Sequence, residues 1–363
     1  MKTIAIARLA VLSLLLFPLA GCQKEAMAGE KPVSHWIKQL QDPDRTKRHD
    51  AANALGQTGP AAKAAVPALT EALKDTDEIV RARAAEALGM IGPDAGSAAP
   101  ALIEVMKKDS YGTARSWAAG ALAGIGMGAK GASVPALMEA LTDKDISRSA
   151  AAALDKMGEG AAAAERLTKI VNDKTATPEA RGNAVMALTY AGDHKPTVSL
   201  LVSIVRDETA DPEIRKRAAL GLGYIGEEAK DAAPALLAAL DQKGVSDSAP
   251  WSLWRLGETE KAVARLSELV VTARDPEVRR NAASGLVSMA GGNAPPEAKA
   301  AVPALIEALK IKDDARLSVV NALGEIGPDA KAAVPALMEL LKDDDSFLRD
   351  RANDAIKKIA PNP

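Results

Sequence analysis

The sequence consists mainly of one short motif that recurs along the chain. The stretch VPALTEALKDTDEIVRARAAEALGMIGPDA at 66–95 returns as VPALMEALTDKD from 134, VPALIEALKIKDD from 302 and VPALMELLKDDD from 334. Copies aligned on the first leucine of this motif lie 30 to 39 residues apart, and ten of them cover 34–363. A period of this size indicates a repeat architecture, in which each unit packs only against its neighbours.

Each copy has the pattern of two consecutive helices. Leucines four residues apart, such as Leu69 and Leu73, form a narrow apolar stripe in the first helix, and an alanine-rich run such as 84–89 is typical of the second. Proline suits the first turn of a helix because its φ angle is fixed. It opens the first helix at Pro67, Pro100, Pro135, Pro234, Pro303 and Pro335. A glycine four residues after the leucine anchor of the second helix predicts a left-handed cap. These glycines are Gly59, Gly92, Gly126, Gly158, Gly192, Gly226, Gly257 and Gly327.

One helix pair of this size cannot bury its apolar face alone, so the copies must stack around a continuous core. The expected fold is therefore all-α, a right-handed α-solenoid of about ten two-helix repeats over 34–363, with no sheet and no second domain. Copy seven is expected to differ, because Ser248 and Pro250 indicate that its second helix starts late.

These motifs resemble the HEAT repeat, specifically the short subclass named for phycobilisome lyases. The resemblance covers about nine tenths of the chain. It implies that the second helices line the concave side of the solenoid and that arginines and aspartates form an inter-repeat ladder. Some relatives in the subclass attach bilins to phycobiliproteins, so a lyase-like enzyme or a chaperone acting on a protein is the alternative function.

An arginine recurs seven residues before the anchor of the second helix. These arginines are Arg48, Arg81, Arg115, Arg181, Arg215, Arg279, Arg316 and Arg349. Acidic residues recur in the preceding turns at Asp42, Asp75, Asp109, Asp143, Asp173, Asp207, Asp275 and Asp343. A phosphate-binding stripe is the functional alternative, but the recurring acids favour the charge-assisted ladder. Ser147 and Ser246 replace the arginine in copies four and seven, where we expect the solenoid to bend or loosen.

Four aromatic residues are predicted to face the concave groove. Helical rotation of about 100° per residue places the positions two and five before and two after the second anchor opposite the core. The middle copies carry Trp117, Met186, Tyr190, Leu220, Tyr224 and Trp251 at these positions. Trp and Tyr dominate interface energies, so this stripe is the candidate protein-binding groove. The alternative is that sharp curvature packs these side chains between adjacent helices.

The first residues of the chain have the layout of an export signal. Lys2 and Arg8 precede the apolar run LAVLSLLLFP, which is too short to span a bilayer. The following Leu-Ala-Gly-Cys at 19–22 resembles the lipobox of bacterial lipoproteins and implies a signal peptide at 1–21, lipidation of Cys22 and a tether over 22–33. An ordinary secretory signal with a chance cysteine is the alternative. Gln23 after the cysteine favours the periplasmic face of the outer membrane or the cell surface.

Composition disfavours several kinds of function. Removal of 1–21 takes away two basic residues and no acidic one, so the remaining charge is 44 − 48 = −4. An exported protein of this charge is a weak candidate for nucleic-acid binding. The histidines, His35, His49 and His194, have no metal-ligand spacing, and no cofactor motif is present. We therefore expect a membrane-tethered, non-enzymatic scaffold that binds an unknown protein or peptide in its groove, without metal or cofactor.

Overall fold

The computed structural model describes residues 25–291 and 293–361, which form an all-α solenoid of ten helix pairs. Cys22, the predicted signal peptide and the first residues of the predicted tether lie outside the described residues. The first helices of the pairs are α1 (Val33–Gln39), α3 (Val66–Ala72), α5 (Ala99–Lys108), α7 (Lys130–Ala140), α9 (Gly160–Asn172), α11 (His194–Arg206), α13 (Ala233–Ala239), α15 (Thr259–Thr272), α17 (Val302–Ala308) and α19 (Val334–Leu340). The second helices are α2 (Arg45–Thr58), α4 (Glu78–Ile91), α6 (Gly112–Ile125), α8 (Ser147–Lys156), α10 (Pro178–Leu188), α12 (Pro212–Ile225), α14 (Ala249–Arg255), α16 (Pro276–Ser288), α18 (Arg316–Ile326) and α20 (Ser346–Ile359).

The second helices begin and end at residues that favour helix termini. Asp77 caps α4 by accepting hydrogen bonds from the backbone N–H groups of Ile79 and Val80, and Asp44 caps α2 in the same way from Thr46. Gly92 ends α4 with φ 79° and ψ −140°. Positive φ was expected at this position, but this ψ belongs to the mirror image of the β region, not to the left-handed helical region. Only glycine adopts this conformation readily.

Short 3-10 helices connect six of the ten repeats to the next, and the sequence pattern did not predict them. They are η1 (Gly59–Ala65), η2 (Gly92–Ala98), η3 (Gly126–Ala129), η4 (Gly226–Ala232), η5 (Pro296–Ala301) and η6 (Gly327–Ala333). Alanines such as Ala62 and Ala65 are fully buried in these connectors, so the connectors extend the core between repeats.

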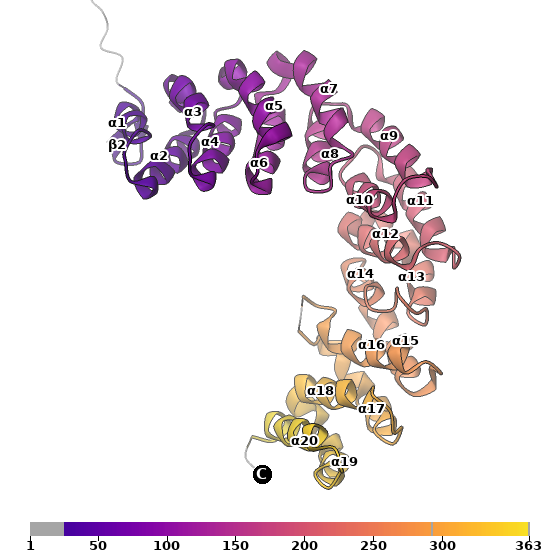
Figure 1. Cartoon of the computed structure of the whole chain (residues 1–363). Helices are drawn as coiled ribbons and strands as arrows, with labels where there is room; N and C mark the ends of the chain where they lie inside the picture. Colours follow the sequence, from indigo (N-terminus) through magenta and orange to yellow (C-terminus); the bar gives the residue numbers. More distant parts are fainter. Residues whose placement is uncertain (1–24, 292, 362–363) are drawn as a thin grey trace, which may run out of the picture.

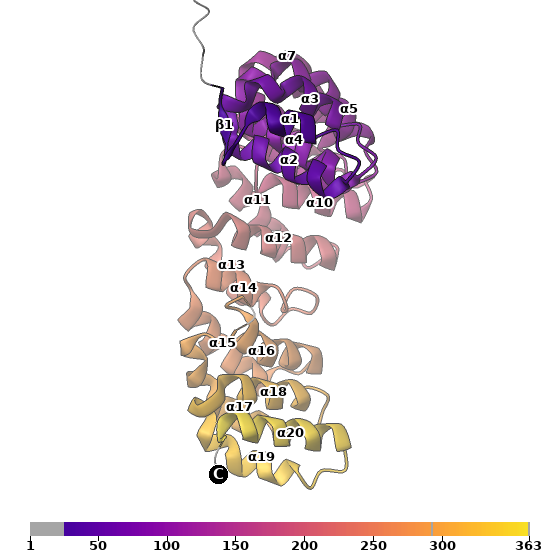
Figure 2. The same ribbon diagram turned by 90° about the vertical axis from the view of Figure 1, so that its left-hand side faces the viewer.

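The core runs through the whole stack between the two layers of helices. The leucine anchors of the second helices are at most 1% exposed in repeats one to nine. Figure 1 shows the second helices along the inner side of an arc and the first helices along its outer side, as the HEAT resemblance implies. The arc bends between α8 and α10, and Figure 2 shows the later repeats descending from the earlier ones in a single column. We call repeats one to four the N-terminal arm and repeats five to ten the C-terminal arm.

A small β-hairpin precedes α1, although no sheet was expected. Its strands are β1 (Met27–Ala28) and β2 (Lys31–Pro32), which pair antiparallel. The Trp36 indole donates a hydrogen bond of 2.9 Å to the Ala28 carbonyl, and Lys31 lies 5.1 Å from the centre of the Trp36 ring. The second half of the predicted tether is therefore packed against the first repeat.

Repeat seven departs from the others as its sequence indicates. Its second helix, α14, starts at Ala249 and has seven residues, and Ser248 and Pro250 are buried. A turn region over 240–248 takes the place of the missing first turns.

Candidate functional site: the concave surface

The exposed large apolar side chains of the described residues gather on the second helices. Ten such side chains are exposed, and six of them belong to second helices or to the turns that directly follow them. These six are Ile79, Met90, Trp117, Tyr190, Tyr224 and Phe347. The second helices form the inner side of the arc (Figure 1), so these six side chains belong to the elements that make up the concave face. Exposed apolar side chains that gather on one face are typical of an interaction site.

The six residues predicted to form the groove differ in exposure. Trp117, Tyr190 and Tyr224 are exposed, with 40%, 37% and 47% of their surface accessible. Leu220 and Trp251 are half-buried, and Met186 is buried at 9%. Of the six side chains, only Met186 is buried by packing between helices, which was the alternative to a groove position.

The structure brings Tyr224 and Trp251 together on neighbouring helices α12 and α14. Their ring centres are 5.0 Å apart with planes tilted by 58°, which is a favourable aromatic geometry. The Arg255 guanidinium lies 6.0 Å from the centre of the Trp251 ring, and its Nε donates to the Gly223 carbonyl. A Cβ atom at Gly223 would lie 2.6 Å from the Trp251 ring. The absence of a side chain at Gly223 therefore allows the Trp251 ring to approach α12 this closely.

Trp117 lies apart from this pair, in the N-terminal arm. It lines a shallow pocket between α6 and α8. The other lining residues are Ser116, Gly120, Ala123, Ser149, Ala152, Ala153 and Lys156. The side chains that α8 contributes to this pocket are small apart from Lys156, and Trp117 is 40% exposed. The predicted stripe thus consists of two aromatic sites on either side of the bend.

Sequence reasoning missed three exposed apolar residues on second helices. Met90 stands two residues after the anchor of α4, which is a position the groove pattern already included. Ile79 and Phe347 stand nine residues before their anchors, a row that the pattern left out although helical rotation places it opposite the anchor. Arg351 lies 4.9 Å from the centre of the Phe347 ring. The position nine residues before the anchor therefore carries exposed apolar side chains near both ends of the arc, in repeats two and ten.

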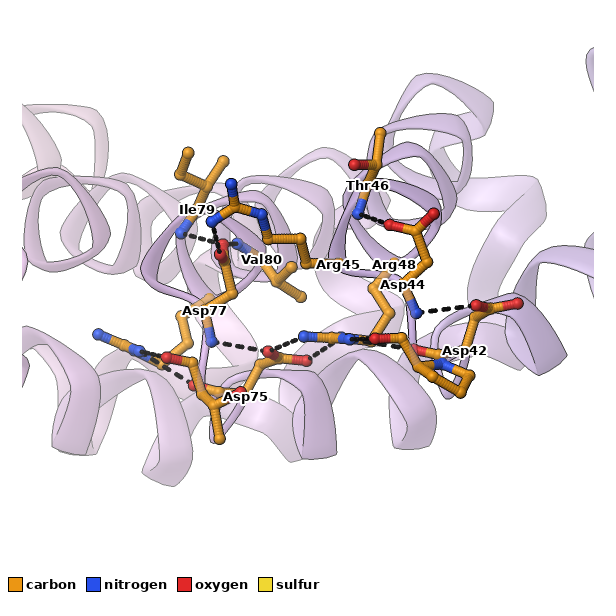
Figure 3. Close-up of polar contacts among 12 residues, drawn as sticks. Asp42, Asp44, Arg45, Thr46, Arg48, Asp75, Asp77, Ile79 and Val80 are labelled. Carbon is orange, nitrogen blue, oxygen red and sulfur yellow. Dashed lines mark hydrogen bonds and ion pairs between the residues drawn. The ribbon is translucent and has the colours of Figure 1, made fainter.

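Arginine–aspartate pairs join successive repeats on the side where the two helices of each repeat connect. The Arg48 guanidinium binds both carboxylate oxygens of Asp75 at 2.7 and 2.8 Å and also donates to the Asp42 carbonyl (Figure 3). Arg81 binds Asp109 through two bonds of 2.7 Å. Equivalent pairs join Arg115 to Asp143, Arg279 to Asp313 and Arg316 to Asp343. We call these five contacts the ladder, and each single arginine–aspartate pair a rung.

The ladder is interrupted in the middle of the solenoid. The interruption extends beyond repeats four and seven, in which Ser147 and Ser246 replace the arginine. Arg181 donates to the Val171 carbonyl of its own repeat, and Asp207 accepts hydrogen bonds from Thr209. Arg215 reaches the neutral side chain of Gln242. Arg349, in the last repeat, donates to the backbone carbonyls of Asp343 and Asp344.

Among the described residues, four aspartates that were predicted to belong to the ladder accept no hydrogen bond from an arginine of the preceding repeat: Asp42, Asp173, Asp207 and Asp275. Asp275 caps α16 by accepting from the Glu277 backbone N–H, so it corresponds to the helix caps Asp44 and Asp77. Asp313 forms the rung in repeat nine, where the pattern identified no acid. Two aspartates stand two residues apart in several turns, as at 42 and 44 or 75 and 77, which makes the rung and the cap easy to confuse.

Contacts of the ladder lower the pKa values of Asp75, Asp109 and Asp143. Burial alone would raise the pKa of the Asp75 carboxyl, but hydrogen bonds from Arg48 and from the Asp77 backbone more than offset it, so the pKa is lowered. The pKa values of Asp109 and Asp143 are lowered by the same balance of burial and an arginine partner. These carboxylates are therefore stabilised in the charged form that the ladder requires.

The described residues show no other arrangement typical of a chemical site. No group of three or more His, Asp or Glu side chains within 25–291 and 293–361 could hold a metal ion. His49 contacts Arg83 at 3.3 Å and Asp50 at 3.5 Å, and His194 contacts Glu228 at 2.9 Å. None of the described helices is long and apolar enough to cross a membrane.

The repeats match a known family over most of the chain. The profile of HEAT repeats matches residues 33–123, 100–189, 174–254 and 263–357. The chain belongs to the HEAT-repeat family. No curated protein matches this HEAT-repeat chain.

Several solved structures are similar to this chain at low sequence identity. A structure of Kap95p with RanGDP matches with 14% identity and a TM-score of 0.48, over 90% of this chain and 51% of that one. This HEAT-repeat chain thus spans about half the length of the karyopherin that it matches. The complex of CpcE and CpcF of phycocyanin lyase from Nostoc sp. PCC7120 matches with 20% identity and a TM-score of 0.36, over 86% and 99%. YibA from E. coli matches with 22% identity and a TM-score of 0.37, over 70% and 91%. These similarities concern the fold.

Proposed function

We propose that the protein is a non-enzymatic scaffold whose concave surface binds another protein or a peptide. The observation that carries this proposal is the gathering of exposed Ile79, Met90, Trp117, Tyr190 and Tyr224 on the inner side of the arc. Exposing these side chains to water is unfavourable by about 25 cal/mol per Å² of apolar surface, and a partner that covers them recovers this free energy. Trp and Tyr side chains are enriched among interface hot spots.

Site-specific photocrosslinking in native membranes tests this proposal. A photoreactive phenylalanine replaces Gly120, which lies beside Trp117 with open space around it. The same residue replaces Met338 on the outer helix α19 as the matched control, because Met338 is also exposed. We expect a discrete crosslinked product from Gly120 only, and less of it when Trp117→Ala is added. Equal products from both positions, unaffected by Trp117→Ala, would contradict a groove function.

We further propose that Cys22 anchors the scaffold by lipid at the periplasmic face of the outer membrane or on the cell surface. The support is the lipobox-like Leu-Ala-Gly-Cys at 19–22 and the preceding apolar run. Two or three acyl chains give lasting attachment, since each buried methylene contributes about 0.8 kcal/mol. Cys22→Ser should move the protein from the membrane pellet to the soluble fraction. A Cys22→Ser protein that stays in the pellet after a high-salt wash contradicts lipid anchoring.

A further inference from the structure

The 3-10 connectors of the N-terminal arm form a continuous row with the N-terminal hairpin. η1 contacts η2, and η2 contacts η3. The hairpin extends this row, because its residues line one cavity together with Thr58 at the end of α2 and Ala61 of η1. Each connector runs from the end of an inner second helix to the start of an outer first helix. The row, which we call the connector edge, therefore lies at the side of the arm, where Figure 2 shows β1.

The connector edge carries strongly exposed apolar side chains. Among the described residues, the two most exposed large apolar side chains are Met127 of η3, at 76%, and Met27 of β1, at 54%. Between them, η1 and η2 expose mainly small or weakly polar residues, including Pro60, Ala64 and Pro93. Exposed apolar side chains that share one edge are typical of a contact with a protein or a membrane.

The connectors of this edge contain few charged residues. η1, η2 and η3 together have one lysine, Lys63, and one aspartate, Asp94. The turns at the opposite edge of the same arm, at 40–44, 73–77, 109–111 and 141–146, contain seven acidic residues and two lysines. The connectors η4 to η6 of the C-terminal arm contain five acidic residues and three lysines. Because a charged group loses hydration when it approaches hydrocarbon, the connector edge is the most compatible of these three with a bilayer.

The charges along the connector edge nearly cancel. Apart from Lys63 and Asp94, the charged residues that border it are Glu25, Glu30, Lys31, Lys130 and Glu159, which gives three positive and four negative groups. Lys130 pairs with Glu159 at 2.8 Å, and Glu25 accepts a hydrogen bond of 2.6 Å from the Ser34 backbone N–H. An anionic lipid surface attracts clusters of lysine and arginine. The connector edge instead suits neutral phospholipid headgroups.

The position of the proposed lipid anchor places the bilayer beside this edge. Cys22 precedes Glu25 by three residues, and an extended chain advances about 3.6 Å per residue, so their Cα atoms are at most about 11 Å apart. From Glu25 onward the chain is fixed to the first repeat, since the Ala26 carbonyl accepts a hydrogen bond of 2.9 Å from the Val33 backbone N–H. A lipid on Cys22 therefore holds the hairpin, and with it one end of the connector edge, at the bilayer surface.

We propose that the connector edge of repeats one to three lies against the phospholipid bilayer that holds the lipid anchor, with Met27 and Met127 among the headgroups. This inference rests on the proposed lipidation of Cys22 and adds the orientation of the scaffold. The anchor makes the contact intramolecular, so a small apolar area is enough to fix the orientation. Because the edge lies at the side of the arm, the contact leaves the concave surface with Trp117 open to a partner.

Fluorescence of a single dye tests the inference on the lipidated full-length protein in phosphatidylcholine vesicles. Cys22 is the only cysteine of the chain, so once it is acylated an introduced cysteine alone reacts with the dye NBD. Ser97→Cys labels the exposed part of η2, and Lys144→Cys labels an exposed turn at the opposite edge as the matched control. We expect the emission at position 97 to shift to the blue and to be quenched by doxyl-labelled lipid. The emission at position 144 should show neither effect, and added salt should change neither signal.

Two further variants show whether the contact extends to η3. Met127→Asp introduces a charge at a side chain that is 76% exposed, so the fold should be unaffected. The dye at position 97 should then lose most of its quenching, because a charged group at this place disfavours contact with lipid. Met338→Asp on the outer helix α19 is the control and should leave the quenching unchanged.

The other outcomes overturn the inference in distinguishable ways. Equal emission from positions 97 and 144 rejects the contact and leaves lipid anchoring intact, because fractionation of the Cys22→Ser protein tests the anchor separately. A blue shift at position 97 without quenching by doxyl lipid would show that a second copy of the chain covers the edge. Quenching that persists in the Met127→Asp protein contradicts a contact that reaches η3.

Discussion

At the scale of single residues, the solenoid uses aspartate in two distinct ways within one turn. Asp75 accepts two hydrogen bonds from Arg48 of the preceding repeat, whereas Asp77, two residues later, caps its own helix. The first contact joins repeats, and the second forms a helix terminus. Both are charge-assisted, and Asp77 additionally receives a long contact of 3.5 Å from exposed Arg45 of the preceding repeat, but only Asp75 forms a two-bond pair between repeats (Figure 3).

Asp109→Asn should destabilise the protein more than the matched change Asp173→Asn. Asp109 receives two bonds of 2.7 Å from Arg81, and its side chain is 5% exposed. Asp173 occupies the same place in repeat five, but it bonds Thr175 in its own turn. The substitution removes the charged partner of the largely buried Arg81 side chain, which should lower the free energy of unfolding by about 1.5–3 kcal/mol. Urea denaturation followed by circular dichroism measures both variants, and equal midpoints would show that the rung contributes nothing.

The ladder predicts that the free energy of unfolding decreases at acidic pH, because its aspartates must be charged to bind arginine. The pKa of Asp75 is lowered in the folded state, so its contribution is complete above the unfolded value of about 3.9 and is lost as the pH falls through the folded value. Asp75→Asn should therefore be less stable than the natural protein at neutral pH and should lose less stability below about pH 4. Urea midpoints across this range provide the measurement. An unchanged pH profile in the variant would show that Asp75 is not linked to folding.

At the scale of elements, glycine and alanine set the distance between neighbouring second helices. A Cβ atom at Gly124 of α6 would lie 2.4 Å from the Gly89 carbonyl oxygen of α4. The same helix carries Gly120, whose Cβ position has nothing within 4 Å. Two glycines four residues apart thus have opposite surroundings, one in a helix contact and one in the groove.

Gly124→Ala should destabilise the N-terminal arm, and Gly120→Ala should not. The added methyl group at Gly124 pushes α4 and α6 apart, and such overpacking costs about 1–3 kcal/mol. At Gly120 the substitution meets open space and improves helix propensity by up to about 1 kcal/mol. Melting temperatures of the two variants compare the effects directly. A Gly124→Ala protein that melts no lower than the Gly120→Ala protein would contradict the close approach of these helices.

The elements also show which features the sequence determines. The repeated proline, leucine and glycine positions predict two helices per repeat, because they are local signals that recur in most of the copies. The 3-10 connectors were missed, because the small residues of a stretch such as 59–65 have no helical period of their own. Exposure in the groove was predicted unevenly: Met186 and Tyr190 both occupy groove positions, yet Met186 is buried and Tyr190 is exposed. This difference depends on the packing between repeats five and six, which no single repeat encodes.

At the scale of the whole molecule, ladder rungs and 3-10 connectors are present or missing together at every junction except six–seven. The junctions between repeats one to four and between repeats eight to ten have both a rung and a connector. Among the described residues, the junctions four–five, five–six and seven–eight have neither. The junction six–seven has a connector and a neutral contact between Arg215 and Gln242. The bend in Figure 1 lies at the first junction without either device.

This coincidence predicts that the solenoid is stiff within the N-terminal arm and flexible across the bend. At junction four–five, Lys130 of the outer helix α7 pairs with Glu159 at 2.8 Å, and Asp155 of the inner helix α8 accepts a single hydrogen bond from the neutral Gly192 backbone N–H. Spin labels three repeats apart compare the two regions on a Cys22→Ser background: Gln41→Cys with Lys144→Cys within the arm, and Lys144→Cys with Lys243→Cys across the bend. All three sites are exposed. Double electron–electron resonance should give a broader distance distribution for the second pair.

Removal of one rung should make the stiff arm resemble the bend. Asp109→Asn deletes the contact with Arg81 between the labels at positions 41 and 144, so we expect their distance distribution to broaden. Asp173→Asn changes a carboxylate that makes no rung, so the distribution between 144 and 243 should stay as it was. Because Tyr190, Tyr224 and Trp251 lie on the flexible side of the bend, a partner protein or peptide bound across repeats five to seven should narrow the second distribution and leave the first unchanged. Equal widths for both pairs in the unsubstituted chain would show that packing of the core alone sets the stiffness of this solenoid.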